Sequence, residues 1–310
     1  MIDLDILLQQ ILNGLVLGSV YALVALGYTM VYGILQLINF AHGDVLMVGA
    51  MVGVTVVTVL GKSGLPMPVL LVLAIAAAVP VCVLLALFIE RVAYRPLRNA
   101  PRLAPLITAI GVSIVIQTVA MIVWKPNPIV FPDLLPTNPV PILGAILAPK
   151  QILILVVSAS MMIGLVLLVN RTRLGRAMRA TAENPRIAGL MGVNANQVIA
   201  ATFAIGAALA AVAGVLVAMN YNIAQFSMGF IPGLKAFTAA VLGGIGNLAG
   251  AMGGGLLLGI IESLGAGYIG DLTGGFLGSH YQDIFAFVVL IIVLVFRPSG
   301  IMGERVADRA

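Results

Sequence analysis

The sequence predicts an all-α, polytopic membrane protein with about eight to nine transmembrane helices. Of its 310 residues, 61% are hydrophobic and only 9% are charged, whereas soluble globular domains carry about 25% charged residues. Apolar runs such as residues 67–89 and 152–169 reach the roughly 17–25 residues with which a helix crosses a bilayer. The composition therefore excludes a soluble protein, and we expect a single transmembrane domain over residues 1–310.

The arginines predict which loops face the cytoplasm. They fall in three clusters: Arg91, Arg95, Arg98 and Arg102; Arg171, Arg173, Arg176, Arg179 and Arg186; and Arg297, Arg305 and Arg309. Short loops rich in Lys and Arg stay on the cytoplasmic side of a membrane, so we place these clusters and the C-terminus inside. The proline-rich loop 125–150 is then outside. Because topology explains the net charge of +5, we expect no nucleic-acid partner.

The membrane spans follow from these anchors. We expect crossings at residues 44–60, 67–90, 104–124, 151–170, 196–220 and 281–297, and two more in a glycine-rich hairpin over 232–267. Residues 6–37 are too long for one straight crossing, because each helical residue adds about 1.5 Å. We therefore expect a tilted or broken N-terminal helix, with a re-entrant piece after Gly27.

Small residues recur at every fourth position in three of the expected helical segments. They are Gly14 and Gly18; Gly206, Ala210 and Gly214; and Gly246, Gly250 and Gly254. Such stripes let helix backbones approach closely in lipid, where apolar burial alone gives little drive for association. We interpret them as helix-packing surfaces. The alternative is that they line a pore.

Three classes of function compete for such a chain: a transporter or channel subunit, a membrane-embedded enzyme and a passive anchor. Two histidines and one cysteine argue against an all-protein metal site. Gly61-Lys62-Ser63 resembles the end of a phosphate-binding loop, but the glycine required five residues before it is Val56. We therefore expect no cofactor in this chain and no enzymatic activity. Transport is favoured, because a passive anchor needs no glycine-rich bundle.

Two charges are expected within the hairpin 232–267, namely Lys235 and Glu262. They lie almost equidistant from a turn near Leu248, so they would meet at similar depth on adjacent helices. Charges inside membranes usually pair with one another, and we interpret the two as a structural ion pair. The alternative is a proton-coupling site in an ion-coupled secondary transporter.

A cytoplasmic partner could supply the energy instead, and the second basic loop points to one. Asn184 and Pro185 form a good helix start, because Asn can cap free amides and Pro suits the first helical position. Gly192 can end this helix. Its apolar face is made of Ile187, Leu190 and Met191. Such a face lies either on lipid headgroups or in a groove of a partner protein.

Four stretches of the chain resemble one family. They read RTRLGRAMRATAENPRIAGLMGVNANQVI (171–199), NGLVLGSVYALVALGYTMVYGILQLINFAHGDVLMVGA (13–50), GLKAFTAAVLGGIGNLAGAMGGGLLLG (233–259) and RPSGIMGE (297–304). In combination they are specific, and each resembles its counterpart in the permeases of ABC importers for branched-chain amino acids. Sister permeases for urea and short amides look similar, so these solutes are the alternative substrates.

The resemblance implies partners for a permease of a bacterial inner membrane. These are a second homologous permease, two cytoplasmic ATPase subunits that use ATP and magnesium, and an extracytoplasmic substrate-binding protein. Residues 171–195 would form the cytoplasmic coupling loop. By this analogy the residues that contact an ATPase subunit are Glu183, Asn184, Pro185, Arg186 and Gly192. The older importer signature, Glu-Ala-Ala followed by Gly, is only loosely kept here as Ala182-Glu183-Asn184 and Gly192.

The stretch INFAHGD, residues 38–44, places three polar side chains between two apolar runs. One interpretation is structural: Asp44 caps the helix that follows, and Gly43 gives its sharp entry. Asn39 would then satisfy backbone groups freed by the break. The other interpretation is that Asn39 and His42 line the substrate path, because an imported amino acid needs polar partners for its ammonium and carboxylate groups.

Overall fold

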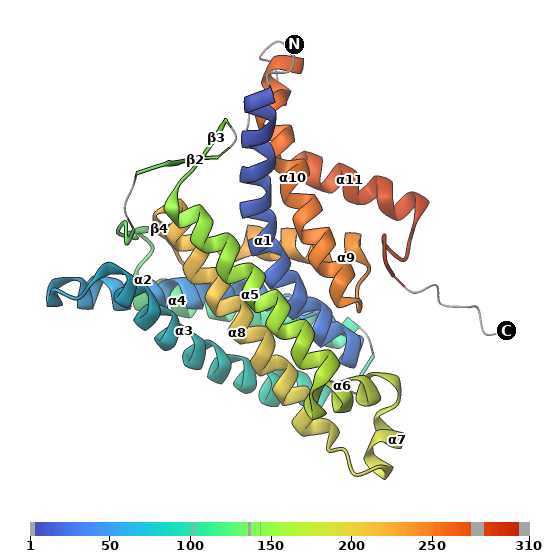
Figure 1. The fold of residues 1–310 in the computed structure, drawn as a ribbon. Coiled ribbons are helices and arrows are strands. Elements are labelled where there is room, and N and C mark those ends of the chain that lie inside the picture. Colours follow the sequence, from blue (N-terminus) through green and yellow to red (C-terminus); the bar gives the residue numbers. More distant parts are fainter. Residues whose placement is uncertain are drawn as a thin grey trace.

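A computed structural model describes residues 4–98, 100–101, 103–135, 138–142, 144–273 and 282–303 (Figure 1). Its helices are α1 (Leu4–Leu35), α2 (His42–Leu60), α3 (Met67–Ile89), α4 (Leu103–Trp124), α5 (Pro149–Arg171), α6 (Arg173–Glu183), α7 (Pro185–Leu190), α8 (Ala195–Tyr221), α9 (Phe230–Gly243), α10 (Leu248–Leu272) and α11 (Gln282–Phe296). Its strands are β1 (Ile129–Val130), β2 (Val140–Ile142), β3 (Ala145–Leu147) and β4 (Ile223–Ala224). A π-helix, Glu90–Tyr94, and a 3-10 turn, Arg95–Leu97, follow α3.

These helices confirm an all-α, polytopic membrane protein. Within the described ranges, seven helices are long and apolar enough to cross a membrane. Two shorter apolar helices lie at 230–243 and 287–296, so the total is consistent with the predicted eight to nine. The glycine-rich hairpin is present as α9 and α10.

The N-terminal helix is unbroken, which corrects the expected re-entrant piece after Gly27. α1 is one helix of 32 residues. Its glycines allow close contact with neighbouring elements and do not bend the helix. A Cβ on Gly14 would lie 2.6 Å from the α10 backbone, and one on Gly18 would lie 2.8 Å from it. At Gly27 the space beside the helix is filled by the imidazole of His42. Neighbouring elements therefore hold α1 helical through the position where the sequence suggested a break.

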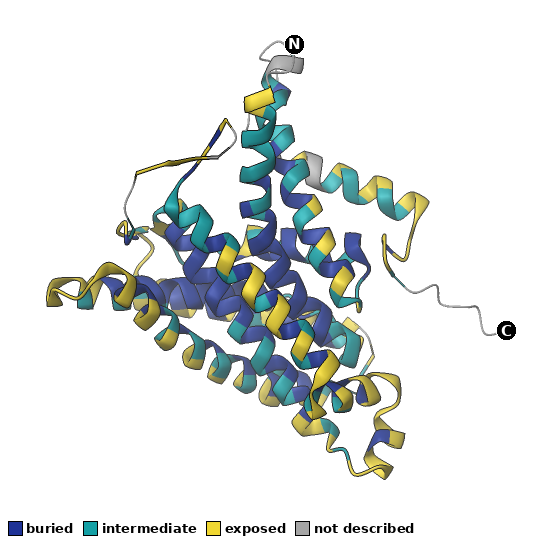
Figure 2. Ribbon diagram, viewed as in Figure 1, coloured by how far each residue is buried: buried dark blue, intermediate teal, exposed yellow. Residues whose placement is uncertain are grey.

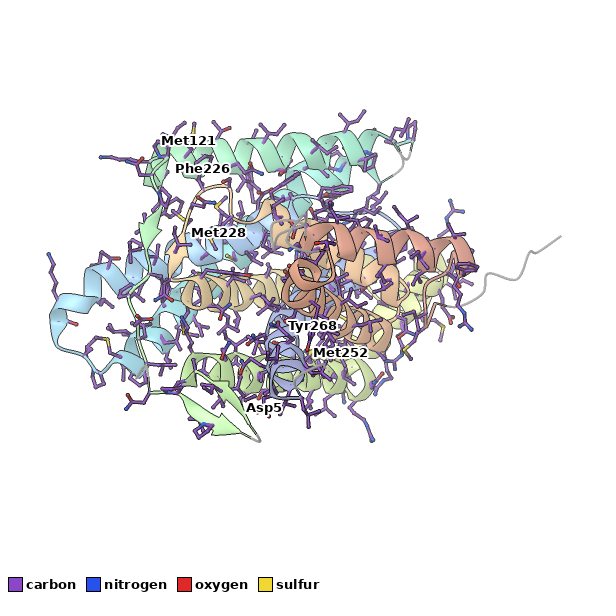
Figure 3. All side chains as sticks on the ribbon, turned by 90° about the horizontal axis from the view of Figure 1, so that it is seen from above. Asp5, Met121, Phe226, Met228, Met252 and Tyr268 are labelled. Atoms are coloured by element: carbon purple, nitrogen blue, oxygen red, sulfur yellow. The ribbon has the colours of Figure 1, made fainter. Side chains whose placement is uncertain are left out.

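The core lies where α1, α2 and α8 meet. In the most apolar part of these helices 89%, 67% and 72% of residues are buried, against 33%, 22% and 28% in α3, α4 and α5. Figure 2 shows the same division, with buried residues gathered at the centre of the bundle. Seen from above, α4 with Met121 lies at one edge (Figure 3). The outer helices therefore offer their apolar side chains to lipid or to another subunit.

Most of the predicted small-residue stripes are packing surfaces. Gly214 of α8 lies directly against the Leu46 carbonyl of α2, and Gly254 of α10 lies against the Ala239 carbonyl of α9. A side chain at either position would drive the two helices apart. Gly246 is different: nothing lies within 4 Å of its added Cβ, and its φ is +96°. This glycine makes the turn between α9 and α10, where a left-handed backbone is needed.

The two ends of the bundle differ in structure. At the end predicted outside, β1 pairs antiparallel with β4, and β2 pairs with β3 inside the loop 125–150. At the opposite end, α6 and α7 carry arginines of the second cluster. A cavity of about 860 Å³ there has walls from Gln36, Asn170, Arg179 and Ser299. The end of α1, the end of α5 and the segment after α11 therefore meet around this cavity. Three of the clustered arginines, Arg102, Arg305 and Arg309, lie outside the described residues.

Single cysteines at Arg176 and Asn138 test the orientation, in a chain whose buried Cys82 is first replaced by alanine. Both positions are exposed, and they lie in α6 and in the loop before β2. With an impermeant thiol reagent on intact cells, we expect Asn138→Cys to be labelled at once and Arg176→Cys only after the membrane is opened. Labelling of both from the same side would overturn this topology.

Candidate functional site

The start of α2 differs from the sequence-based prediction, and this changes the role of Asp44. α2 begins at His42, and its N-cap residue Ala41 makes no side-chain capping bond. Asp44 lies inside the first turn, where its carboxylate accepts a hydrogen bond from Gln117 Nε2 of α4 at 2.9 Å. The prediction that Asp44 caps the helix was wrong, because a donor 73 residues away takes its carboxylate. Asp44 links α2 to α4.

Gly43 does not provide the predicted sharp entry into α2 and has another role. It lies within α2, and an added Cβ would lie 2.5 Å from the Gly229 carbonyl oxygen and 3.0 Å from Gly233 Cα. The backbones of α2 and α9 therefore touch at this point. Only glycine permits so close an approach.

His42 fills a space that glycines leave open between α1, α2 and α8. Its imidazole contacts Gly27 of α1 and lies 3.6 Å from the position of a Cβ on Gly206 of α8. Its ring meets the Tyr28 ring edge-on, with 4.9 Å between centroids. The residue is buried, and Nε2 has no hydrogen-bond partner in the part of the chain that the structure describes. This nitrogen is therefore an unsatisfied polar group in the core. Such a group costs about 1–3 kcal/mol.

Asn39 connects the loop before α2 to the end of α3. Its Oδ1 accepts a hydrogen bond from the Tyr94 hydroxyl at 2.9 Å. Tyr94 belongs to the π-helix, and its ring lies 5.5 Å from the Phe203 ring of α8. Asn39 and His42 are 4% and 3% exposed. A solute could therefore reach them only after α2 separates from a neighbouring element.

Lys235 of α9 is held by two carboxylates. Its Nζ lies 2.5 Å from Glu262 Oε1 of α10 and 2.6 Å from Asp283 Oδ1 of α11. The Tyr21 hydroxyl of α1 lies 3.4 Å from the same nitrogen. Lys235 and Glu262 are buried, whereas the Asp283 side chain is 41% exposed. The sequence placed the first two residues together but missed Asp283 and Tyr21, because spacing within a hairpin carries no information about α1 and α11.

The helix predicted to start at Asn184 is present as α7. Asn184 Oδ1 accepts hydrogen bonds from the amides of Arg186 and Ile187 at 3.0 and 3.1 Å, and Pro185 takes the first helical position. Gly192, with φ of +84°, lies just beyond its end. Glu183 is the last residue of α6. The coupling role of these residues stays a prediction.

The apolar face of α7 points away from the rest of the molecule. The exposed apolar side chains are Ile187, Leu190 and Met191. Within α7 itself only Ala188 is buried. α6 and α7 form a separate projection at the end of the bundle where α5 ends and α8 begins (Figure 1).

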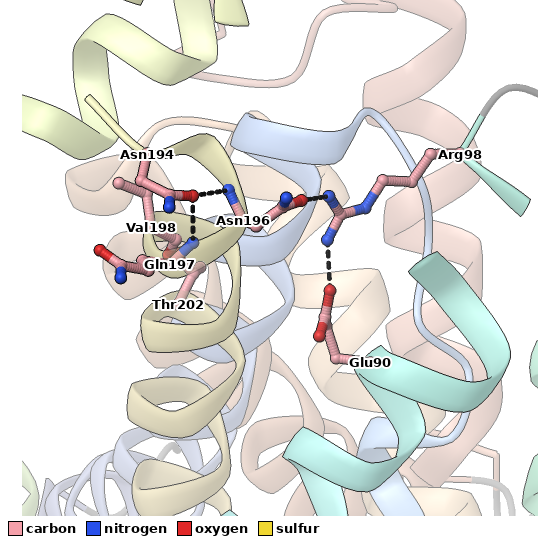
Figure 4. Close-up of polar contacts among 7 residues, drawn as sticks. All are labelled: Glu90, Arg98, Asn194, Asn196, Gln197, Val198 and Thr202. Atoms are coloured by element: carbon pink, nitrogen blue, oxygen red, sulfur yellow. Dashed lines mark hydrogen bonds and ion pairs between the residues drawn. The ribbon is translucent and has the colours of Figure 1, made fainter. Parts of the chain in front are cut away.

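Sequence reasoning missed a partly buried ion pair at this end. Arg98 pairs with Glu90 and donates a hydrogen bond from Nη1 to Asn196 Oδ1 at 2.6 Å (Figure 4). The arginine cluster was interpreted only as a signal of topology. The available clue was Glu90, an acid placed directly before that cluster.

A bundle of apolar helices with polar and charged side chains buried between them is typical of a multi-pass membrane transport protein. The family described as "Branched-chain amino acid transport system / permease component" matches residues 10–294. The chain belongs to this family.

Relatives are similar over nearly their whole length. The chain is 50% identical to the high-affinity branched-chain amino acid transport system permease protein BraD of Pseudomonas aeruginosa, over 97% of each chain. It is 45% identical to the corresponding protein LivH of Escherichia coli, again over 97% of each. A probable branched-chain amino acid transport permease protein LivH of Methanocaldococcus jannaschii is 30% identical over 95% of this chain and 92% of its own length. No solved structure matches the chain.

Variants of the Lys235 cluster separate a structural from a proton-coupling role. Lys235→Met leaves two acids facing each other, and breaking a buried pair costs about 3–5 kcal/mol, so we expect little folded protein and a lowered Tm. Glu262→Gln leaves Lys235 paired with Asp283 and should cost less. The double variant Lys235→Met/Glu262→Gln should recover much of what Lys235→Met loses. Yield and thermal unfolding in detergent measure this order.

The control for a functional role is uptake by the same variants. If the double variant folds as well as the parent protein and transports nothing, the charges act in transport itself. A Tm of Lys235→Met equal to that of the parent would show that the ion pair does not support the fold.

Proposed function

We propose that this chain is a transmembrane permease subunit of an ABC importer and forms half of a translocation path for branched-chain amino acids. The proposal rests on the identities of 50% and 45%, over 97% of the chain, with two proteins named as branched-chain amino acid transport permeases. These relatives favour leucine, isoleucine and valine over urea or short amides. The chain itself catalyses no reaction in this scheme.

The permease works with partners on both sides of a bacterial inner membrane. We infer a second homologous permease, two cytoplasmic ATPase subunits that bind ATP and magnesium, and an extracytoplasmic protein that delivers the amino acid. The separation of the arginines from the loop 125–150 supports this orientation. Residues 304–310 lie outside the described residues, so a cytoplasmic C-terminus stays a prediction from charge.

We assign α7 to the contact with an ATPase subunit. Ile187, Leu190 and Met191 are 58%, 87% and 81% exposed on a helix that projects from the bundle. Burial of a Leu or Ile side chain contributes about 1.5–3 kcal/mol, so a groove on a partner would bind this face. An amphipathic helix in a groove is a common form of recognition.

α7 is connected to α5 through α6 and to α8 through the short linker 191–194. Before it, Thr172 Oγ1 accepts a hydrogen bond from the Gly175 amide at 3.1 Å, and Arg179 donates to the Val169 carbonyl of α5. After it, Asn194 caps α8 by accepting from two backbone amides at 3.1 and 3.3 Å. A displacement of α7 would therefore pull on α5 and α8.

Asn39 and His42 are our candidates for the substrate path. An amino acid carries an ammonium and a carboxylate group, and each needs a partner when it leaves water. The unpaired Nε2 of His42 and the amide of Asn39 lie between α1, α2, α3 and α8. Asp44 is engaged with Gln117, so we assign it to holding α4 against α2.

Uptake into vesicles that contain the whole complex tests the proposed function. With ATP inside and the binding protein outside, we expect uptake of radiolabelled leucine, isoleucine or valine that requires ATP and persists when a protonophore collapses the proton gradient. Urea and acetamide are the control solutes and should not be transported. Uptake that stops with the gradient while ATP stays high would reject the importer and make Glu262 the first residue to examine.

The assignment of α7 gives a separate prediction. Ile187→Asp and Leu190→Asp place a charge on the docking face, so we expect loss of ATP-dependent uptake and loss of the ATPase subunits on purification. The permease should still insert, because both side chains are exposed. Ala180→Asp adds the same charge to an exposed site on α6 and is the matched control, with uptake near that of the parent. Normal uptake by both α7 variants would exclude the docking role.

A further inference from the structure

The helix that begins as α3 does not end as an α-helix. Glu90–Tyr94 form a π-helix, and Arg95–Leu97 form a 3-10 turn directly after it. A π-turn holds more residues than an α-turn, is rare, and occurs frequently at functional sites. Its two buried residues are Glu90 and Tyr94, and each makes a side-chain contact with another part of the chain.

Glu90 connects the π-helix to the start of α8. Its carboxylate pairs with the Arg98 guanidinium, and the two side chains are 6% and 19% exposed. Arg98 Nη1 donates to Asn196 Oδ1 at 2.6 Å, and Figure 4 shows this side chain between Glu90 and Asn196. Asn196 lies in the first turn of α8, two residues after the cap residue Asn194. The first turn of α8 follows α7 after a linker of only a few residues.

Tyr94 connects the π-helix to the loop before α2. Its hydroxyl donates to Asn39 Oδ1 at 2.9 Å, and its ring packs on Phe203 of α8. A continuous series of contacts therefore leads from the linker after α7 through Asn196, Arg98 and Glu90 to the π-helix. From there Tyr94 leads to Asn39, three residues before the start of α2.

Arg98 is not required in this place by topology. Arg91 and Arg95 are exposed in the same cluster and can serve as cytoplasmic anchors. Glu90 is buried and Arg98 is partly exposed, so the pair costs some desolvation, and well-packed apolar residues in place of such a pair are often as stable or more stable. The pair is best explained by a geometric role, since it fixes the π-helix to α8 in one arrangement.

We propose that Arg98 is a positioning residue that couples movement of α7 to the Tyr94–Asn39 contact through the π-helix, a role that rests on the proposed function. Conversion of the π-turn to an α-turn would shift the register by one residue and rotate Tyr94 by roughly 100°. This rotation removes the Tyr94 hydroxyl from Asn39 and frees the loop before α2. Displacement of Asn196 by the docked partner triggers the conversion, because Arg98 carries the displacement to Glu90.

The test measures uptake and ATP hydrolysis by the whole complex in the same vesicles. Arg98→Ala should lower the amino acid transported per ATP by about tenfold, a change within the usual range of coupling between sites, while ATP hydrolysis and co-purification of the ATPase subunits persist. Arg98→Lys keeps the charge but loses the fork that contacts Glu90 and Asn196 together. Its transport per ATP should lie between that of the parent and that of Arg98→Ala. The control is Arg95→Ala, an exposed member of the cluster, with an unchanged ratio.

Tyr94→Phe is the second variant, because it removes one hydroxyl and keeps the packing on Phe203. We expect the same fall in transport per ATP, and this variant decides the question if Arg98→Ala does not assemble. Unchanged ratios in Tyr94→Phe and in an assembled Arg98→Ala would overturn the inference, as would a parallel loss of uptake and hydrolysis. Failure of the proposed function is distinguishable, since the parent complex would then show no ATP-dependent uptake.

Discussion

Close approach between helix backbones is the constraint on which this structure depends. In lipid, apolar burial gives little drive for helix association, so contact must come from packing of small residues. Gly14 and Gly18 bring α1 against α10, Gly214 brings α8 against α2, and Gly43 brings α2 against α9. In each case the neighbour is backbone. A methyl group at any of these sites would move a whole helix.

The same close packing determines how polar groups are arranged. Helices in direct contact leave no room for water between them, so buried polar side chains must find partners on neighbouring elements. Lys235 meets acids from two other helices, Asp44 meets Gln117 of α4, and Asn39 meets Tyr94. These contacts pin particular helices together. His42 Nε2, which has no such partner among the described residues, is therefore the natural place to look for a transient ligand.

The end predicted to be cytoplasmic combines an exposed apolar helix with short connections to the bundle. α7 is capped by Asn184 and followed by the capped start of α8, so it projects as a defined surface. An exposed face alone would only bind a partner. In the proposed function, binding acts on transport because α7 packs on α6 and on the start of α8, and Asn196 of α8 bonds to Arg98. Energy released in a partner could in this way reach the loop before α2 through contacts already present.

The sequence by itself determined the features that depend on composition and local spacing. Hydrophobicity indicated the membrane class, and Asn184-Pro185 indicated the start of α7, because a cap and a proline act within one turn. The orientation inferred from the arginine clusters stays a prediction. The tertiary structure decided the rest. α1 runs unbroken past Gly27, Asp44 bonds to α4 instead of capping α2, Asp283 joins Lys235, and Arg98 bridges Glu90 and Asn196. Each depends on a neighbour from a distant part of the chain, and local spacing carries no information about which distant helix will lie alongside.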